Sequence, residues 1–317
     1  MLNLLLLLIG FLPLIYGANL LVDNASSLAK RLNIPAIVIG LTIVGFGTST
    51  PEMVVNIFAA IDKNSNIALG NIIGSNIFNI LGILGISAMI YPIVVKKNTT
   101  WIEIPLCLLS AIVVIVVAND IIIDRADSSQ ISRIDGLIML LFFAIFLVYN
   151  ITLSFKEGYE GDMEIKSRSS WLAVILIITG LALLVAGGRI IVVYAVKVAS
   201  TIGLSERVIA LTIISIGTSL PELATSVVAA RKKNADIAIG NIVGSNIFNV
   251  FFILGLTAVI NPVSLLPLSN FDILVNIATS LLLFIVIFTG RGKSINRFEG
   301  FLFLLFFVAY LVVLLAL

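Results

Sequence analysis

The sequence repeats itself once over most of its length. Shifting the chain by 170 residues places residues 38–92 on residues 208–262, and more than half of the aligned positions are identical. The same shift pairs Gly10 with Gly180, and a shift of 164 pairs Gly136 with Gly300. The chain therefore consists of two related halves, and any fold that it adopts must accommodate both.

Each half contains five long apolar stretches. Of the 317 residues, 60% are hydrophobic and 11% are charged, whereas a soluble domain has roughly 45–50% apolar and roughly 25% charged residues. A transmembrane helix needs about 20 mostly apolar residues. We predict an all-α membrane protein of ten transmembrane helices, near residues 2–22, 35–60, 66–90, 101–119, 134–152, 171–196, 205–230, 236–260, 271–289 and 298–316.

The odd number of spans in each half fixes how the halves are related. We predict a first five-helix repeat over 1–153, a linker over 154–170 and a second five-helix repeat over 171–317. After five spans the second half enters the membrane from the opposite side, so the repeats are inverted. Inverted repeats are a recurring plan of secondary transporters, whose binding site lies at mid-membrane between the halves.

Basic residues predict the orientation, because loops on the cytoplasmic side carry an excess of Lys and Arg. If the N-terminus is outside, the outer ends carry only Lys63, Arg125, Arg133, Lys197 and Arg207. The cytoplasmic ends then carry Lys30, Arg31, Lys96, Lys97, Lys156, Lys166, Arg168, Arg231, Lys232, Lys233, Arg291, Lys293 and Arg297. We therefore predict a multi-pass protein of the plasma membrane with a cytoplasmic linker and both termini extracellular.

The second span of each half contains a proline followed by a carboxylate. The segments read GTSTPE, which ends at Glu52, and GTSLPE, which ends at Glu222. Pro51 and Pro221 each leave a carbonyl without its helical hydrogen bond, and an acidic residue at mid-bilayer costs roughly 2.5–3.5 kcal/mol or more. Two protonated glutamic acids bonded across a packing kink would explain this pattern, but we favour facing carboxylates that bind a cation.

The third span of each half adds hydroxyl and amide groups. It begins with GNIIGSNIFN at Gly70 or GNIVGSNIFN at Gly240. Ser75 and Asn79 lie one turn apart on one helical face, as do Ser245 and Asn249. For both asparagines we favour cation coordination or gating over polar packing.

The other small and amide residues of these segments have less specific interpretations. Glycines four residues apart allow close helix packing, and we favour that role for Gly70, Gly74, Gly240 and Gly244. The remaining asparagines fall on other helical faces, where packing or capping and ligation are equally good explanations. They are Asn71, Asn76, Asn241 and Asn246.

The available ligand atoms indicate which ions such a site could hold. The chain has no histidine and only one cysteine, Cys107, which excludes histidine and thiolate metal sites. Carboxylate, hydroxyl and carbonyl oxygens suit Ca²⁺ or Na⁺ better than Zn²⁺ or Cu²⁺. No cofactor is expected beyond the transported ions. A net charge of +2 gives no indication of a nucleic-acid partner, and no obligate protein partner is evident.

The doubled GTSxPE and GNxxGSNxFN segments resemble the two α-repeats of the sodium/calcium exchanger family, within the cation/calcium antiporter superfamily. They occupy 42–90 and 212–260. The resemblance implies alternating access, a core of spans 2, 3, 7 and 8, and sliding of spans 1 and 6 across it. It also implies ion ligands at Glu52, Glu222, Thr48, Thr218, Ser49, Ser219, Ser75, Ser245, Asn79, Asn249, Gly45 and Ser215.

The resemblance has one departure and one limit. Many members of the family have Asp where this chain has Asn249, so the charge balance of the central site differs from theirs. The linker of residues 154–170 is far too short for the regulatory domains of animal exchangers. We therefore expect a prokaryotic-type exchanger.

Sodium/calcium antiport is the leading hypothesis for function, and H⁺/Ca²⁺ antiport with the two glutamates as proton carriers is its nearest alternative. The paired hydroxyl residues beside each glutamate favour Na⁺, because a proton needs no cage of additional oxygens. A passive cation channel is a more remote alternative, since no pore loop is obvious. An intramembrane protease is remoter still, because the chain lacks histidine and a catalytic Ser–Lys or Asp–Asp pair. We expect no enzymatic activity.

Overall fold

The computed structural model describes residues 2–123, 125–156, 169–201, 215–265, 269–289 and 293–316. Almost all of them are helical. The first half consists of α1 (Leu2–Leu32), α2 (Ala36–Ile39), η1 (Gly40–Val44), α3 (Gly45–Thr48), α4 (Thr50–Ile61), α5 (Ser65–Ile77), η2 (Phe78–Leu84), α6 (Gly85–Ile90), β1 (Ile93–Val94), η3 (Thr99–Glu103), α7 (Ile104–Val117), α8 (Asp120–Ile123), β2 (Gln130–Ile131) and α9 (Arg133–Lys156), where η marks a π-helix.

The second half repeats this order. It consists of α10 (Ser170–Thr201), α12 (Ser215–Thr218), α13 (Leu220–Arg231), α14 (Ala235–Ile247), η5 (Phe248–Leu254), α15 (Gly255–Ile260), β3 (Val263–Ser264), α16 (Ser269–Thr289), β4 (Ser294–Ile295) and α17 (Arg297–Ala316). The core spans of both halves begin with a capping asparagine, since Asn64 and Asn234 accept hydrogen bonds from the backbone N–H groups of Ile67 and Ile237.

Nine of the ten predicted spans are present in the described residues. Eight helices are long and apolar enough to cross a membrane, and the bent pair 36–48 and 50–61 makes a ninth span. The remaining predicted span, the seventh in chain order, near 205–230, is described only from Ser215, so its first part lies outside the described residues. The first span was predicted too short, because α1 continues to Leu32. Asp23 and Ser26, just beyond the predicted end, are bonded to Lys232 and Asn234 of the other half.

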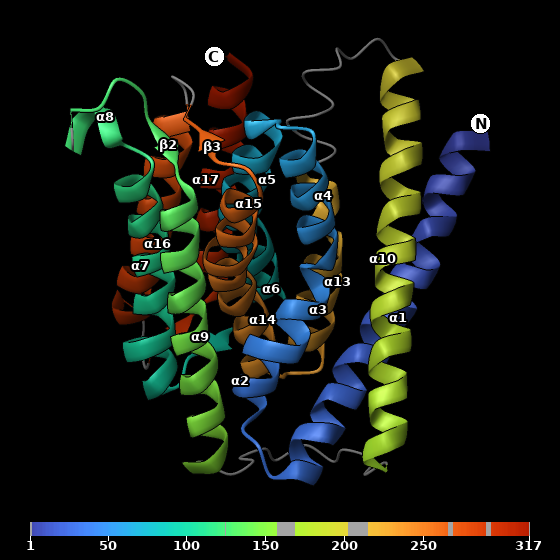
Figure 1. The fold of residues 1–317 in the computed structure, drawn as a ribbon. Coiled ribbons are helices and arrows are strands. Elements are labelled where there is room, and N and C mark those ends of the chain that lie inside the picture. The colour runs from blue at the N-terminus through green and yellow to red at the C-terminus, as the bar shows by residue number, and fades with distance from the viewer. Residues whose placement is uncertain are drawn as a thin grey trace.

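The long helices α1 and α10 lie side by side and run in opposite directions (Figure 1). Glycines allow their backbones to touch. A Cβ atom added at Gly17 would lie 2.7 Å from the carbonyl oxygen of Gly180, and one at Gly187 would lie 2.8 Å from that of Gly10. The 170-residue shift interchanges these two contacts, which is the relation expected of inverted repeats.

The other inter-half contacts follow the same symmetry. β1 pairs with β4 and β2 with β3, both antiparallel, so each half contributes one strand to each two-stranded sheet. Gly85 of α6 packs closely on Gly300 of α17, and Gly136 of α9 packs on Gly255 of α15. These contacts tie the peripheral helices of each half to the core of the other.

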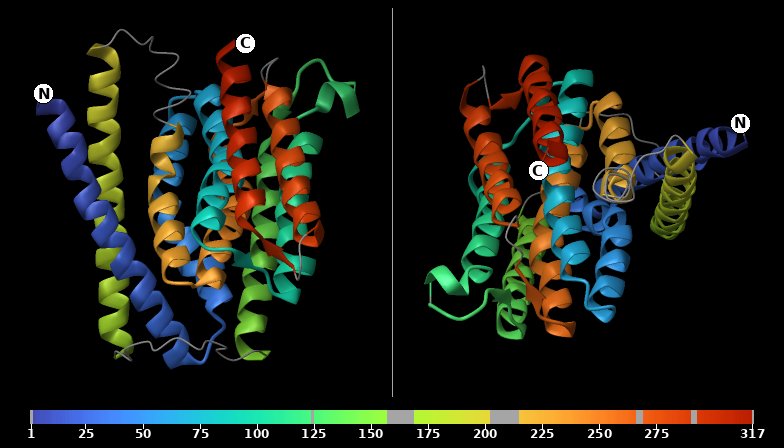
Figure 2. Two further views of the ribbon diagram at one scale, coloured as in Figure 1. Left: turned by 180° about the vertical axis from the view of Figure 1, so that it is seen from behind. Right: turned by 90° about the horizontal axis from the view of Figure 1, so that it is seen from above.

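The helices form a central group with two helices beside it. The third and eighth spans, α5–η2–α6 and α14–η5–α15, are mostly buried. In contrast, α1 and α10 stand to one side of the bundle (Figure 2) and are mostly exposed. The chain termini lie at the same end of the molecule, opposite the basic last turns of α1 and α9 (Figure 1).

The second span bends where the sequence places its proline. The segments Ala36–Thr48 and Thr50–Ile61 meet at an angle of 48°, with Pro51 in the first turn of α4. The carbonyl of Gly47 lies four residues before Pro51, whose ring nitrogen cannot donate the helical hydrogen bond, and it accepts a hydrogen bond from the Thr50 hydroxyl at 2.8 Å instead. Because this carbonyl is satisfied locally, the side chains of the motif, rather than this oxygen, make the contacts with the other half.

The close helix packing predicted for the glycines in the third span of each half is confirmed in the second half. Gly240 would place a Cβ 3.1 Å from the Cα of Gly40, and Gly244 would place one 2.5 Å from the carbonyl oxygen of Leu41. In the first half, Gly70 meets no described residue within 4 Å. Close packing of α14 on η1 therefore depends on glycine at Gly240 and Gly244, because a Cβ atom at either position would lie too close to η1.

Replacing Gly187 by Ala should lower the melting temperature of the purified protein. The new Cβ would lie 2.7 Å from the backbone nitrogen of Leu14, and overpacking of this kind costs about 1–3 kcal/mol. The matched control is Gly188→Ala, whose Cβ would have no described neighbour nearer than 3.7 Å. Differential scanning fluorimetry should show no loss of stability in the control, and equal melting temperatures for both variants would contradict the packing account.

Candidate functional site

The two motif glutamates lie at equivalent places in the two halves. Glu52 is in the first turn of α4 and Glu222 is in the first turn of α13, each directly after the helix break. Their exposed fractions are 0% and 1%. No lysine or arginine makes an ion pair with either carboxylate in the described part of the chain. A buried carboxylate without such a partner is stable only if other groups compensate for the lost water.

Serines of the opposite half provide part of this compensation. The Ser49 hydroxyl donates to Glu222 Oε1 at 2.8 Å, and the Ser219 hydroxyl donates to Glu52 Oε1 at 2.8 Å. Each serine directly precedes the helix of its own glutamate, so the two motifs cross. The carboxylates therefore belong to one site that both halves build together.

The third and eighth spans add a second hydroxyl to each carboxylate. Ser75 Oγ lies 3.4 Å from Glu52 Oε1, and Ser245 Oγ lies 3.5 Å from Glu222 Oε1. Ser75 Oγ is also 3.0 Å from Ser219 Oγ, and Ser245 donates to the carbonyl of Gly45 at 3.2 Å. Oxygen atoms of four motif segments thus converge on the same place.

Four buried oxygens of this cluster have no hydrogen-bond partner among the described residues. They are Glu52 Oε2, Glu222 Oε2, Asn79 Oδ1 and Asn249 Oδ1. Buried polar atoms are normally paired, and the symmetry of the four makes an accident of packing a poor explanation. A bound cation is one partner that such unpaired oxygens could take.

The asparagines of the two GSN segments are bonded across the halves. Asn79 Nδ2 donates to Asn246 Oδ1 at 2.9 Å, and Asn249 Nδ2 donates to Asn76 Oδ1 at 3.0 Å. Asn76 and Asn246 each donate to the other's backbone carbonyl at 3.2 Å. All four side chains are buried. Asn79 and Asn249 lie in the π-helical segments η2 and η5, a form of helix often found at functional sites.

The motif threonines use their hydroxyls for another cross-half contact. Thr48 Oγ1 bonds Asn241 Oδ1 at 3.0 Å, and Thr218 Oγ1 bonds Asn71 Oδ1 at 3.2 Å. Each motif threonine thus contacts an asparagine of the other half. Ser215 begins α12, and its side chain lies outside the described residues.

Two polar residues below the glutamates were not singled out from the sequence. Asn56 donates to the backbone carbonyl of Glu52 at 3.0 Å, whereas its equivalent, Ser226, accepts from Asn241 at 2.9 Å. Both are fully buried. Their spacing of four residues from Glu52 and Glu222 was the available signal, because it places them one turn further along the same helix.

The donor set consists of oxygen atoms with two possible negative charges. The described residues contain no group of three or more His, Cys, Asp or Glu side chains that could hold a metal ion. A cation held here would take most of its ligands from neutral oxygens. Such ligands suit hard cations such as Ca²⁺ and Na⁺.

Comparison with known proteins agrees with this chemistry. The family model described as "Sodium/calcium exchanger protein" matches residues 2–152 and again 172–316. The inner membrane protein YrbG of Escherichia coli is 36% identical over 94% of each chain. The sodium/calcium exchanger MaX1 of Methanosarcina acetivorans is 33% identical over 98% of each chain.

The solved structures of the sodium–calcium exchanger NCX_Mj have the same fold. One of them, obtained with Na⁺ and without Ca²⁺, superposes with a TM-score of 0.84 at 30% identity and covers 98% of both chains. Others were obtained with Ca²⁺ or Sr²⁺. The match to two consecutive copies of the family model and to this fold identifies an all-helical membrane protein built from inverted repeats.

Proposed function

Because the chain belongs to the sodium/calcium exchanger family, a family of membrane transporters, we propose that it exchanges Na⁺ for Ca²⁺ across the membrane by alternating access. The observation that carries the proposal is the pair of buried glutamates, each bonded by a serine of the other half and each retaining one unpaired oxygen. The proposed ligands are Glu52, Glu222, Ser49, Ser219, Ser75, Ser245, Asn79, Asn249 and the backbone carbonyls of Thr48, Thr218, Gly45 and Ser215.

The charge of the site supports exchange rather than one-way transport. Two ionised carboxylates neutralise either one Ca²⁺ or two Na⁺, so both ions can compete for the same oxygens. When the site holds no cation, the two negative charges are buried beside each other and repel. An empty carrier therefore crosses between its two states less readily than a loaded one, and this couples the two ion fluxes.

The serines favour Na⁺ over H⁺ as the counter-ion. A proton on a carboxylate needs one acceptor, whereas Na⁺ needs a shell of oxygens. The hydroxyls of Ser75 and Ser219 lie within 3.4 Å of Glu52 Oε1, and their equivalents surround Glu222. These neutral oxygens can complete a Na⁺ shell beside each carboxylate.

We also propose an orientation in the plasma membrane. The halves 1–153 and 171–317 are joined by a linker over 154–170 on the cytoplasmic side, which leaves both termini outside. The basic last turns of α1 and α9 lie at the end opposite the termini (Figure 1), and this supports the arrangement. The related YrbG carries the description inner membrane protein.

An outward Na⁺ gradient should drive Ca²⁺ into proteoliposomes that contain the purified protein, with equal pH on both sides. Replacing internal Na⁺ by K⁺ should abolish uptake, because no Na⁺ then leaves the vesicles in exchange for Ca²⁺. The assay measures ⁴⁵Ca²⁺ retained by the vesicles. Uptake that ignores Na⁺ but follows a pH gradient would instead establish H⁺/Ca²⁺ antiport, and uptake with no counter-ion would indicate a channel.

Replacing Glu52 or Glu222 by Gln should each reduce exchange to background. Glutamine keeps the size and the acceptor for the bonding serine but removes the negative charge that the cation requires. Glu299→Gln is the matched control, because Glu299 is also buried but accepts the Asn296 N–H at 2.7 Å in a capping box, which glutamine can maintain. Normal exchange in either site variant, at equal protein yield, would refute the shared-carboxylate site.

A further inference from the structure

Two buried asparagines next to the proposed ligands fix the direction of those ligands' amides. Asn76 Nδ2 points at the backbone carbonyl of Asn246, at 3.2 Å. A carbonyl can only accept a hydrogen bond, so the amide of Asn76 cannot be reversed without losing this bond. Its Oδ1 must then face the other way, toward Asn249.

The fixed acceptor determines the orientation of the next amide. Asn249 meets Asn76 Oδ1 at 3.0 Å and must present its Nδ2 there. Its own Oδ1 is left buried and unpaired among the described residues. The same reasoning in the other half runs from the carbonyl of Asn76 through Asn246 to Asn79, whose Oδ1 is also buried and unpaired.

We propose that Asn76 and Asn246 are positioning residues that turn the amide oxygens of Asn249 and Asn79 toward the transported cation. This rests on the proposed function. Neither positioning residue contacts the ion. Asn249 then acts as a neutral oxygen ligand, so the site needs no third carboxylate. A carboxylate at position 249 would place an acceptor against the acceptor Asn76 Oδ1, which makes asparagine the matching partner here.

The crossed pairing gives a test with built-in controls. The single variants Asn76→Ala, Asn79→Ala and Asn249→Ala are compared with the double variants of Asn76 with each of the other two. The measurement is the Ca²⁺ concentration that gives half-maximal Na⁺-driven uptake. Melting temperatures of all variants show that the proteins are folded.

Asn249→Ala should raise this concentration by about tenfold, the effect of losing about 1.4 kcal/mol of binding. Asn76→Ala should raise it nearly as much, and the double variant with Asn249→Ala should be no worse than Asn249→Ala alone. Asn76→Ala with Asn79→Ala should instead multiply the two single effects. This contrast separates positioning from general loss of packing, because Asn76 and Asn79 lie on the same helical span.

The positioning role would be overturned if the double variants of Asn76 with Asn249 and with Asn79 departed equally from the product of their single effects. Normal Ca²⁺ affinity in Asn76→Ala, when that of Asn249→Ala is impaired, would overturn it as well. Normal affinity in both Asn79→Ala and Asn249→Ala would remove these two residues from the proposed ion site. The two failures are therefore distinguishable.

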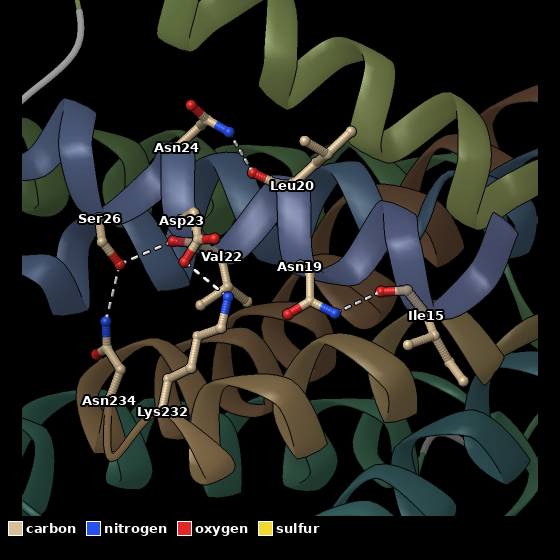
Figure 3. Close-up of polar contacts among 9 residues, drawn as sticks. All are labelled: Ile15, Asn19, Leu20, Val22, Asp23, Asn24, Ser26, Lys232 and Asn234. Atoms are coloured by element: carbon tan, nitrogen blue, oxygen red, sulfur yellow. Dashed lines mark hydrogen bonds and ion pairs between the residues drawn. The ribbon is translucent and has the colours of Figure 1, made fainter. Parts of the chain in front are cut away.

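A separate set of contacts connects α1 to the turn between α13 and α14. Asp23 pairs with Lys232 at 2.7 Å, and Asn234 Nδ2 donates to Ser26 Oγ at 3.0 Å (Figure 3). α1 also packs along α13, whereas within the described residues its counterpart α10 has no comparable packing on α4. The two halves thus differ in how their outer helix meets the core.

The positions that the repeat relates to these residues cannot make the same contacts. The 170-residue shift places Val193 at the position of Asp23 and Val196 at that of Ser26, while Asp62 takes the place of Lys232. Two valines and an aspartate can form neither the ion pair nor the hydroxyl bond. When inverted repeats exchange conformations, the contact of Figure 3 is lost, and the residues at the equivalent positions cannot form it again.

We infer that the bonds of Asp23 and Ser26 to this turn form a latch that favours the state with α1 against α13. Like the first proposal, this rests on alternating access. The populations of this state and of the state with α1 away from α13 can be measured from the distance between two spin labels. The labels are attached at Lys30→Cys and Arg231→Cys, both exposed sites in the last turns of α1 and α13. Cys107 is buried and stays unlabelled.

Asp23→Asn should shift the populations by about two- to fivefold toward the longer distance, the effect of a partly exposed ion pair. The matched control Asp62→Asn should leave them unchanged. Transplanting the latch with Val193→Asp and Asp62→Lys should favour the longer distance even with Asp23 intact. A single distance in all variants would refute alternating access at this contact. Two distances whose population ratio is the same with and without Asp23 would refute the latch alone.

Discussion

The hydrogen bonds from Ser49 to Glu222 and from Ser219 to Glu52 are the interactions on which the rest of the structure depends. Each buried carboxylate is solvated by a hydroxyl that belongs to the other half, so neither half can bury its glutamate alone. The burial also requires that helices begin at the glutamates, which the motif prolines permit. Both the broken spans and the close contact of the two halves follow from this requirement. The remaining symmetric contacts, from the paired glycines to the two small sheets, hold the halves in that register.

Much of this arrangement could be predicted from the sequence because it depends on local pattern. Apolar length gave the spans, the repeat gave two halves, and the cost of Glu52 and Glu222 in a membrane marked the site. The partners of each motif residue could not be predicted in this way. Helical spacing does not pair Asn76 and Asn246 with asparagines of the other half, and only the approach of the two halves brings their amides onto Asn249 and Asn79. Pro51 predicts that the Gly47 carbonyl loses its helical hydrogen bond, but not that the Thr50 hydroxyl of the same segment replaces it.

Symmetry and its violations have different consequences in this molecule. The proposed ion site is nearly symmetric, as a site that is presented to both sides of a membrane should be. The contact of α1 with the α13–α14 turn is asymmetric in sequence and in structure. Such a difference outside the site can change the relative stability of the two conformations without altering the ligands. Affinity and conformational preference can therefore vary independently along this chain.

If the two halves build a single shared cation site, each chain has one place for Ca²⁺. Equilibrium dialysis of the purified protein against ⁴⁵Ca²⁺ measures this number, because it counts sites without requiring transport. One Ca²⁺ should bind per chain, and Na⁺ should displace it. Two Ca²⁺ ions per chain, each lost independently when one of the two glutamates is replaced, would show instead that each half has its own site.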